Sequence, residues 1–230
     1  MEYTFLTKNK EIIKIDLIDV NDELIVNQPS NIIAFKASSH GNRKDFIFDE
    51  IKIKKYQLKS KINGESSIYI KSSNNSEIKI LELNDKKYVF NFNILFYTKD
   101  VKVNLYLDEF AKFIYTNDAF QYKCSGSGII GYYAEGTAID VLLSIGETIF
   151  INPYYVLGYE DTIKYEFKTY GNTKAALNMD YHYKFTGPGN IIVQTQALID
   201  DILKVNKTTG DNVFKRALKE WIPGGSVILK

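Results

Sequence analysis

Three glycines in the segment GSGIIG, residues 126–131, form the pattern in this sequence that most resembles a cofactor-binding motif. Gly126, Gly128 and Gly131 fit G-x-G-x-x-G, a pattern in which a pyrophosphate meets the N-terminus of a helix. That chemistry needs a helix after the glycines, but the residues that follow are YYAEGTAIDVLL, which include Gly136 and several poor helix formers. We therefore expect no dinucleotide or other cofactor here. We expect the glycines to allow a turn that leads into a strand.

Few other side chains have the types and spacing that catalysis requires. The two histidines, His40 and His182, lie far apart in the sequence, and Cys124 is the only cysteine. A metal site needs several such ligands, and a thiol nucleophile needs an orienting base. Carboxylates at 135, 140 and 147 could form an acid–base pair, but the acid at 147 recurs at corresponding positions elsewhere in the chain. We expect that recurring acid to mark a turn, and we expect the chain not to be an enzyme or to hold a metal.

The charge balance argues against a globally basic, nucleic-acid-binding surface. Lysine and arginine number 29 against 28 acids, which gives a net charge of +1. The segment 51–61, IKIKKYQLKSK, is locally basic, and Lys52, Lys54 and Lys59 alternate there with apolar residues. We interpret these lysines as a solvated strand face, with a phosphate-binding strip as the alternative. No run of 18 apolar residues and no apolar N-terminal core occurs, so we expect no membrane span and a cytoplasmic location.

An internal repeat organises the chain. The segments ELIVNQPSNIIAF (23–35), DKKYVFNFNILFY (85–97) and ETIFINPYYVLGY (147–159) align without a gap at an offset of 62 residues. Corresponding positions hold apolar residues at Ile32, Ile94 and Val156, aromatic residues at Phe35, Tyr97 and Tyr159, and acids at Glu23, Asp85 and Glu147. Such agreement predicts three copies of one supersecondary unit.

The local patterns are those of strands. Short alternating or apolar runs such as EIKILEL and YHYKF are separated by clusters of Asn, Gly, Asp and Ser. We therefore predict an all-β fold, a barrel or sandwich, with three units near residues 1–60, 61–122 and 123–197 in one continuous domain. The segment 211–222 predicts a helix within a C-terminal tail, residues 198–230.

The motifs around the glycines resemble those of a known family. SGSGII (125–130), LLSIGETIFI (142–151) and FTGPGNIIVQT (185–195) are similar to the signatures of the altered-inheritance-of-mitochondria protein 24 family, also called the mitochondrial biogenesis family. The residues that carry the resemblance are Gly126, Gly128, Gly146, Glu147, Gly187, Pro188 and Gly189. It implies three fused copies like the subunit of the tryptophan RNA-binding attenuation protein, a short double-stranded β-helix. Bacterial members of the family lack an assigned activity.

Two classes of function remain open from the sequence. The first is a non-enzymatic β-scaffold that binds a partner protein or forms an oligomer. In that case we expect Phe214, Leu218 and Trp221, on one face of the C-terminal helix, to pack on the β-body or on another subunit. The second is a protein that binds a small molecule or a nucleic acid, as the resemblance to the attenuation protein implies.

Overall fold

The computed structural model describes residues 1–49, 56–72, 76–91, 93–107, 120–169 and 181–196. These residues form strands joined by turns and short 3₁₀ helices, so the prediction of an all-β fold is confirmed. The helix predicted at 211–222, with Phe214, Leu218 and Trp221, lies outside the described residues. Among the residues described, no helix is long and apolar enough to cross a membrane.

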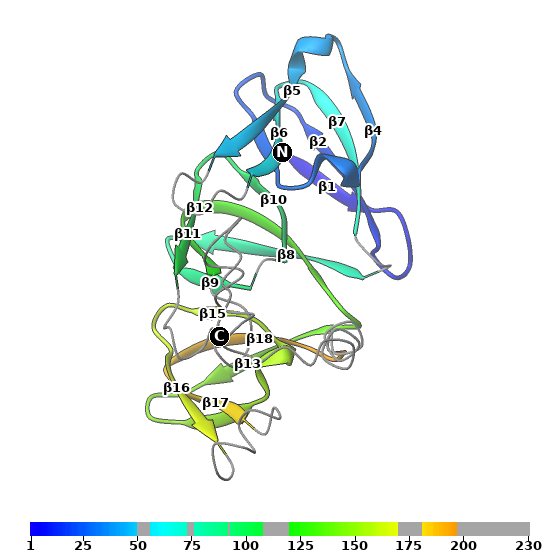
Figure 1. The fold of residues 1–230 in the computed structure, drawn as a ribbon. Helices are drawn as coiled ribbons and strands as arrows, with labels where there is room; N and C mark the ends of the chain where they lie inside the picture. The colour runs from blue at the N-terminus through cyan, green and yellow to red at the C-terminus, as the bar shows by residue number, and fades with distance from the viewer. Residues whose placement is uncertain (50–55, 73–75, 92, 108–119, 170–180, 197–230) are drawn as a thin grey trace, which may run out of the picture.

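The strands fall into three sets that follow one another along the long axis of the molecule (Figure 1). The first set contains β1 (Glu2–Phe5), β2 (Ile12–Leu17), β3 (Glu23–Val26), β4 (Ile32–Ala37), β5 (Arg43–Asp49), β6 (Tyr56–Asn63) and β7 (Ser66–Lys71). The middle set contains β8 (Glu77–Asn84), β9 (Tyr88–Phe90), β10 (Ile94–Thr98), β11 (Val101–Leu107) and β12 (Phe120–Ala134). The last set contains β13 (Ala138–Leu143), β14 (Thr148–Ile151), β15 (Val156–Glu160), β16 (Lys164–Thr169), β17 (Tyr181–Thr186) and β18 (Gly189–Gln194). The 3₁₀ helices are η1 (Pro29–Asn31), η2 (His40–Asn42) and η4 (Pro153–Tyr155).

The same antiparallel pairings recur in each set. In the first set, β2 and β4 pair with β7, while β3 and β5 pair with β6. In the last set, β13 and β15 pair with β18, while β14 and β16 pair with β17. The middle set uses the two halves of one strand: β8 and β10 pair with the C-terminal half of β12, and β9 and β11 with its N-terminal half.

One irregularity recurs with the pairings. β4, β10 and β15 begin at Ile32, Ile94 and Val156, the positions that the 62-residue offset relates. Each of these strands shifts register over its first three residues, so that Ile33, Leu95 and Leu157 lie inside the shift. The division of the chain into three units, near 1–60, 61–122 and 123–197, stays our interpretation of these recurrences.

Two further pairings join the sets. β10 of the middle set pairs with β3 of the first, and β15 of the last set pairs with β9 of the middle set. These joints produce an 11-stranded sheet, which lies beside a four-stranded sheet, β1-β2-β7-β4, and a three-stranded sheet, β14-β17-β16, in the described part of the chain. Alternation of buried and exposed residues drives this packing: in β2, for example, Ile13, Ile15 and Leu17 are buried and the residues between them are not.

Candidate functional site

The glycines of GSGIIG lie within β12 and not at the start of a helix. Gly126 pairs with Val101 on β11, and Gly128 pairs with Leu83 on β8. Gly126 has a φ of +103°, and a Cβ on it would collide with the carbonyl oxygen of Asp100. The strand continues to Ala134, so no helix N-terminus follows that could bind a pyrophosphate. The glycines serve the close approach of neighbouring strands to β12.

The remaining motif residues bring two turns together in the last set. The Glu147 carboxylate accepts a hydrogen bond from the Ser144 amide at 2.8 Å, and the Gly187 amide donates to the Glu147 carbonyl at 3.0 Å. Gly187 precedes a cis peptide bond to Pro188, and a Cβ on Gly187 would collide with the Ser144 carbonyl oxygen. Gly146 and Gly189 complete the two turns with positive φ angles. These residues therefore hold the β13–β14 turn against the β17–β18 turn.

The recurring acid does not keep one partner. The Glu23 carboxylate pairs with the Lys61 ammonium at 2.5 Å, and the Asp85 carboxylate accepts a hydrogen bond from the Ser127 hydroxyl at 2.6 Å. All three acids stand at or just before the strands β3, β9 and β14. These two contacts each join the start of a strand to another part of the fold.

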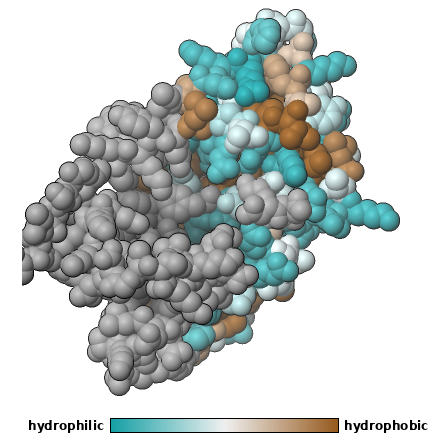
Figure 2. Space-filling view, turned by 45° about the vertical axis from the view of Figure 1, so that its right-hand side comes forward, coloured by the Kyte–Doolittle hydropathy of each residue, from teal (hydrophilic) through white to brown (hydrophobic). Residues whose placement is uncertain are grey.

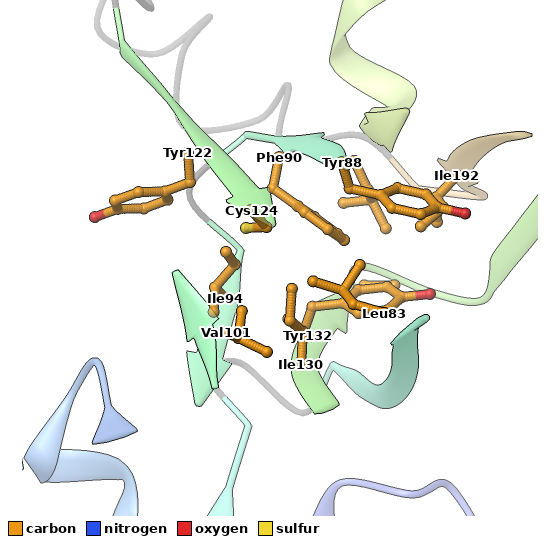
Figure 3. Close-up of a cluster of buried hydrophobic side chains, with 12 residues drawn as sticks. Leu83, Tyr88, Phe90, Ile94, Val101, Tyr122, Cys124, Ile130, Tyr132 and Ile192 are labelled. Carbon is orange, nitrogen blue, oxygen red and sulfur yellow. The ribbon is translucent and has the colours of Figure 1, made fainter. Parts of the chain in front are cut away.

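The residues that could have formed a nucleophile or a metal site are not assembled into one. Cys124 is buried in the hydrophobic cluster of the middle set, between Tyr122 and Phe90 (Figure 3), and burial raises the pKa of its thiol to about 12. His40 is exposed in η2, and His182 is half-buried on β17 of the last set. In the described ranges no group of three or more His, Cys, Asp or Glu side chains could hold a metal ion.

One sequence interpretation is wrong. Lys59, expected on a solvated strand face, is only 2% exposed, and its ammonium lies 5.8 Å from the centre of the Tyr97 ring. β6 pairs with β3, and β3 pairs with β10, so the joint between the first and middle sets brings Lys59 of β6 to Tyr97 of β10. Lys52 and Lys54 lie outside the described residues.

Sequence patterns missed a buried carboxylate, Glu160 of β15. Its Oε1 accepts hydrogen bonds from the Lys86 ammonium at 2.6 Å and from the Tyr88 hydroxyl at 3.0 Å. Burial alone would raise the pKa of Glu160, but these two hydrogen bonds, the charge of Lys86 and a hydrogen bond from the Asn190 backbone together hold the pKa below its usual value. Burial also raises the pKa of Tyr88 to about 12, so Tyr88 stays a hydrogen-bond donor near neutral pH. The contacts join the middle set to the last set.

Two asparagines mark the joints between sets in the same way. The Asn27 amide donates to the Leu95 carbonyl at 2.8 Å, and its side-chain Nδ2 donates to the Ile94 carbonyl at 3.0 Å. The Asn91 amide donates to the Leu157 carbonyl at 2.9 Å, and its Nδ2 donates to the Val156 carbonyl at 2.8 Å. Each asparagine directly follows the last residue of a joining strand, β3 or β9. A single Asn residue, through its backbone amide and its side chain, thus binds the first two residues of the strand that arrives from the next set.

Large apolar side chains are exposed in the last set. Leu142, on β13, is 77% exposed, and Ile145, in the following turn, is 88% exposed. Leu142 pairs with Asn190, and the corresponding pairs in the other sets place the acids Asp16 and Glu82 at the position of Leu142. At this one position the last set therefore has an aliphatic side chain where the other two have carboxylates.

Solved structures support the fold. Among those that match, a Streptococcus pyogenes protein whose crystal structure was determined by a structural genomics consortium superposes with a TM-score of 0.71 at 14% sequence identity. The match covers 90% of this chain and 99% of that one. This likeness extends to the fold alone. No curated protein matches the sequence.

Family membership follows from the part of the chain that contains the motif turns and the joint between β9 and β15. The family model described as mitochondrial biogenesis AIM24 matches residues 44–196, which include β12, the 144–147 turn and the glycine–proline turn before β18. The match spans well over half of the chain and all of the motifs on which the resemblance was based. The chain belongs to the mitochondrial biogenesis AIM24 family.

Proposed function

We propose that this chain is a non-enzymatic β-scaffold that acts by binding proteins through its surface. The observation that carries the proposal is the strong exposure of Leu142 and Ile145, together with the acids that stand at the position of Leu142 in the other two sets. Exposed aliphatic side chains cost solubility, and a contiguous exposed apolar surface commonly marks an interaction site.

The reactive groups of the described residues support a structural role. The Cys124 thiol is buried in packing, with a pKa raised to about 12, so it would contain almost no thiolate near neutral pH. The buried carboxylate of Glu160 is occupied by Lys86 and Tyr88. These groups hold strands together, and such use leaves them unsuited to nucleophilic or acid–base work.

The basic segment also favours a protein partner over a nucleic acid. Lys59 is buried beneath Tyr97, and Lys61 pairs with Glu23. A lysine buried inside the fold, as Lys59 is, cannot neutralise a phosphate on its surface.

The test is a comparison of the proteins recovered with three forms of the full chain. The double variant Leu142→Ser/Ile145→Ser should lose its partners by about tenfold or more, because removing aliphatic side chains from an interface weakens binding appreciably. The matched control is Val20→Ser, which removes a side chain that is 72% exposed in a turn of the first set and should leave recovery unchanged. Quantitative mass spectrometry of the recovered proteins measures the difference. Equal recovery with all three forms contradicts the proposal.

A further inference from the structure

The two joints between sets pair the same two kinds of strand. At the ends of the molecule, the corresponding strands lack that pairing in the described residues. At each joint, the strand that begins at Ile94 or Val156 pairs with the strand that ends in Val26 or Phe90 of the preceding set. β4 is the corresponding strand of the first set, and β14 is the corresponding strand of the last set. In the described part of the chain, β4 and β14 each end a sheet, with a neighbour on one side only.

Burial shows the same difference at the β4 end. Leu95 and Leu157, in the register shift of β10 and β15, are buried, and each belongs to a hydrophobic cluster made largely of residues from the preceding set. The corresponding residue of β4, Ile33, is 54% exposed. Hydrophobic surface is visible on this N-terminal end of the molecule, where β1 and β4 lie (Figures 1 and 2).

The β14 end is exposed in a complementary way. β17 pairs Tyr183 with Ile151, just as Ser60 pairs with Val26 and Tyr122 with Phe90, so Ile151 corresponds to those two buried residues. Ile151 is only half-buried, and its neighbour Phe150 is 49% exposed where Val89 of β9 is buried. Asn152 follows Ile151 as Asn27 follows Val26 and Asn91 follows Phe90.

We propose that a second copy of this chain covers each of these edges, with β4 of one molecule pairing antiparallel with β14 of another. The inference rests on the proposed protein-binding function and adds a second binding surface, the β4 and β14 edges, whose partner is another copy of this chain. The joints fix the register: Ala34 would lie opposite Ile151, and Phe35 opposite Phe150, as Phe96 lies opposite Val26 and Tyr97 opposite Ile25. The Asn152 amide would donate to the Ile33 carbonyl and its Nδ2 to the Ile32 carbonyl of the other chain. Ile33 would enter the hydrophobic cluster of the last set.

Such pairing is head-to-tail, because the two surfaces differ and lie at opposite ends of the molecule (Figure 1). A heterologous interface of this kind yields either a closed ring or an open filament. It also predicts a behaviour that a symmetric dimer does not show, since blocking one end leaves the other end competent.

The test uses two single variants of the full chain, each blocked at one end. Ile33→Lys places a charge on the β4 edge, and Phe150→Lys places one on the β14 edge, whereas Val20→Lys is the matched control. Sedimentation should show concentration-dependent association for the wild type and the control, and single chains of 26.4 kDa for either variant alone. An equimolar mixture of the two variants should form a two-chain species, because each supplies the edge that the other lacks. Circular dichroism verifies that each variant is folded.

A cross-link measures the register directly. A chain carrying Ala34→Cys mixed with a chain carrying Ile151→Cys should form an interchain disulfide, since directly opposite non-hydrogen-bonded residues of antiparallel strands have Cα atoms about 4.5 Å apart. Ala34→Cys mixed with Ile149→Cys is two residues out of register and should cross-link poorly. The native Cys124 is buried and serves as an internal control for background oxidation.

Three results overturn the inference: a wild type that stays a single chain at high concentration, variants that associate as the wild type does, or a mixture of variants that fails to pair although the wild type associates. None of these results decides the proposed function. If recovery of partner proteins still depends on Leu142 and Ile145, the scaffold role stands and only the self-association through β4 and β14 is wrong.

Discussion

Gly126 and Gly146 show that two motif glycines with positive φ angles are required to different degrees. A Cβ on Gly126 would meet the backbone of Asp100, whereas nothing lies within 4 Å of the position that a Cβ on Gly146 would take. The sequence identifies both residues as motif glycines. It does not show which glycine is needed because a Cβ would clash and which only because its φ angle is positive.

The substitution Gly126→Ala should therefore cost more stability than Gly146→Ala. We expect a loss of about 3 kcal/mol or more for Gly126→Ala, because backbone strain and overpacking add, and about 1–2 kcal/mol for Gly146→Ala, where only the positive φ angle is penalised. Urea denaturation of the two variants measures the difference. Equal losses would show that β12 yields to the added methyl group.

Two polar residues whose burial the sequence does not indicate lie where strands from different sets meet. Lys59 alternates with apolar residues as a solvated residue does, and Glu160 gives no local sign of burial. Lys59 lies over the Tyr97 ring of β10, and Glu160 pairs with Tyr88 of β9, so each contacts a strand tens of residues away in sequence. Local periodicity reports which side of a strand faces a core, but it contains no information on which strand will cover an edge.

At the scale of the elements, the joints between sets depend on asparagine clamps. Substitution of Asn27 by Ala removes the hydrogen bond to the Ile94 carbonyl at a buried site. We expect a loss of about 1–3 kcal/mol, because the carbonyl loses its partner away from water. Asn31→Ala is the control, since Asn31 is only half-buried and its Nδ2 bonds the exposed side chain of Gln28. Thermal or urea unfolding measures the stability of both variants. Equal losses of stability would show that the Asn27 hydrogen bond does not hold the joint together.

The joint between β9 and β15 should depend on pH through Glu160. Its folded-state pKa lies below the ordinary value of 4.5, so its ionised form stabilises the fold above that value. This contribution is lost as the pH falls below 4.5 through the folded-state pKa. We therefore expect Glu160→Gln to be less stable than the wild type at neutral pH, and the gap to close in acid.

Glu166→Gln provides the control for that measurement. The pKa of Glu166 is also lowered, chiefly by a hydrogen bond from Lys168, but this pair is exposed and screened by water. Urea unfolding from pH 7 to pH 3 should show a pH-dependent difference for Glu160→Gln and almost none for Glu166→Gln. A constant difference for Glu160→Gln would mean that packing, and not charge, gives this residue its effect.

At the scale of the whole molecule, the sequence predicts the β architecture and the 62-residue spacing better than it predicts surfaces. Apolar alternation and the glycine–acid positions recur because each set must bury the same face, and Ile32, Ile94 and Val156 all begin a strand. The open edges at β4 and β14 follow only from knowing that β10 pairs with β3 and β15 with β9. That information is in the contacts between sets and not in any one segment.

The order in which the sets occur along the chain has a consequence for its synthesis. All strands of the first set lie within the first 71 residues, and every pairing inside it can form before the middle set leaves the ribosome. The outer edge of β3 then stays unpaired only until β10 has been synthesised, and the outer edge of β9 only until β15 has been synthesised. These two nascent edges are thus each covered by the next stretch of the same chain within one round of translation. The last edge, on β14, has no later strand among the described residues to cover it. Polysomes place several nascent chains side by side, and a neighbouring chain there could supply a strand that pairs with the β14 edge.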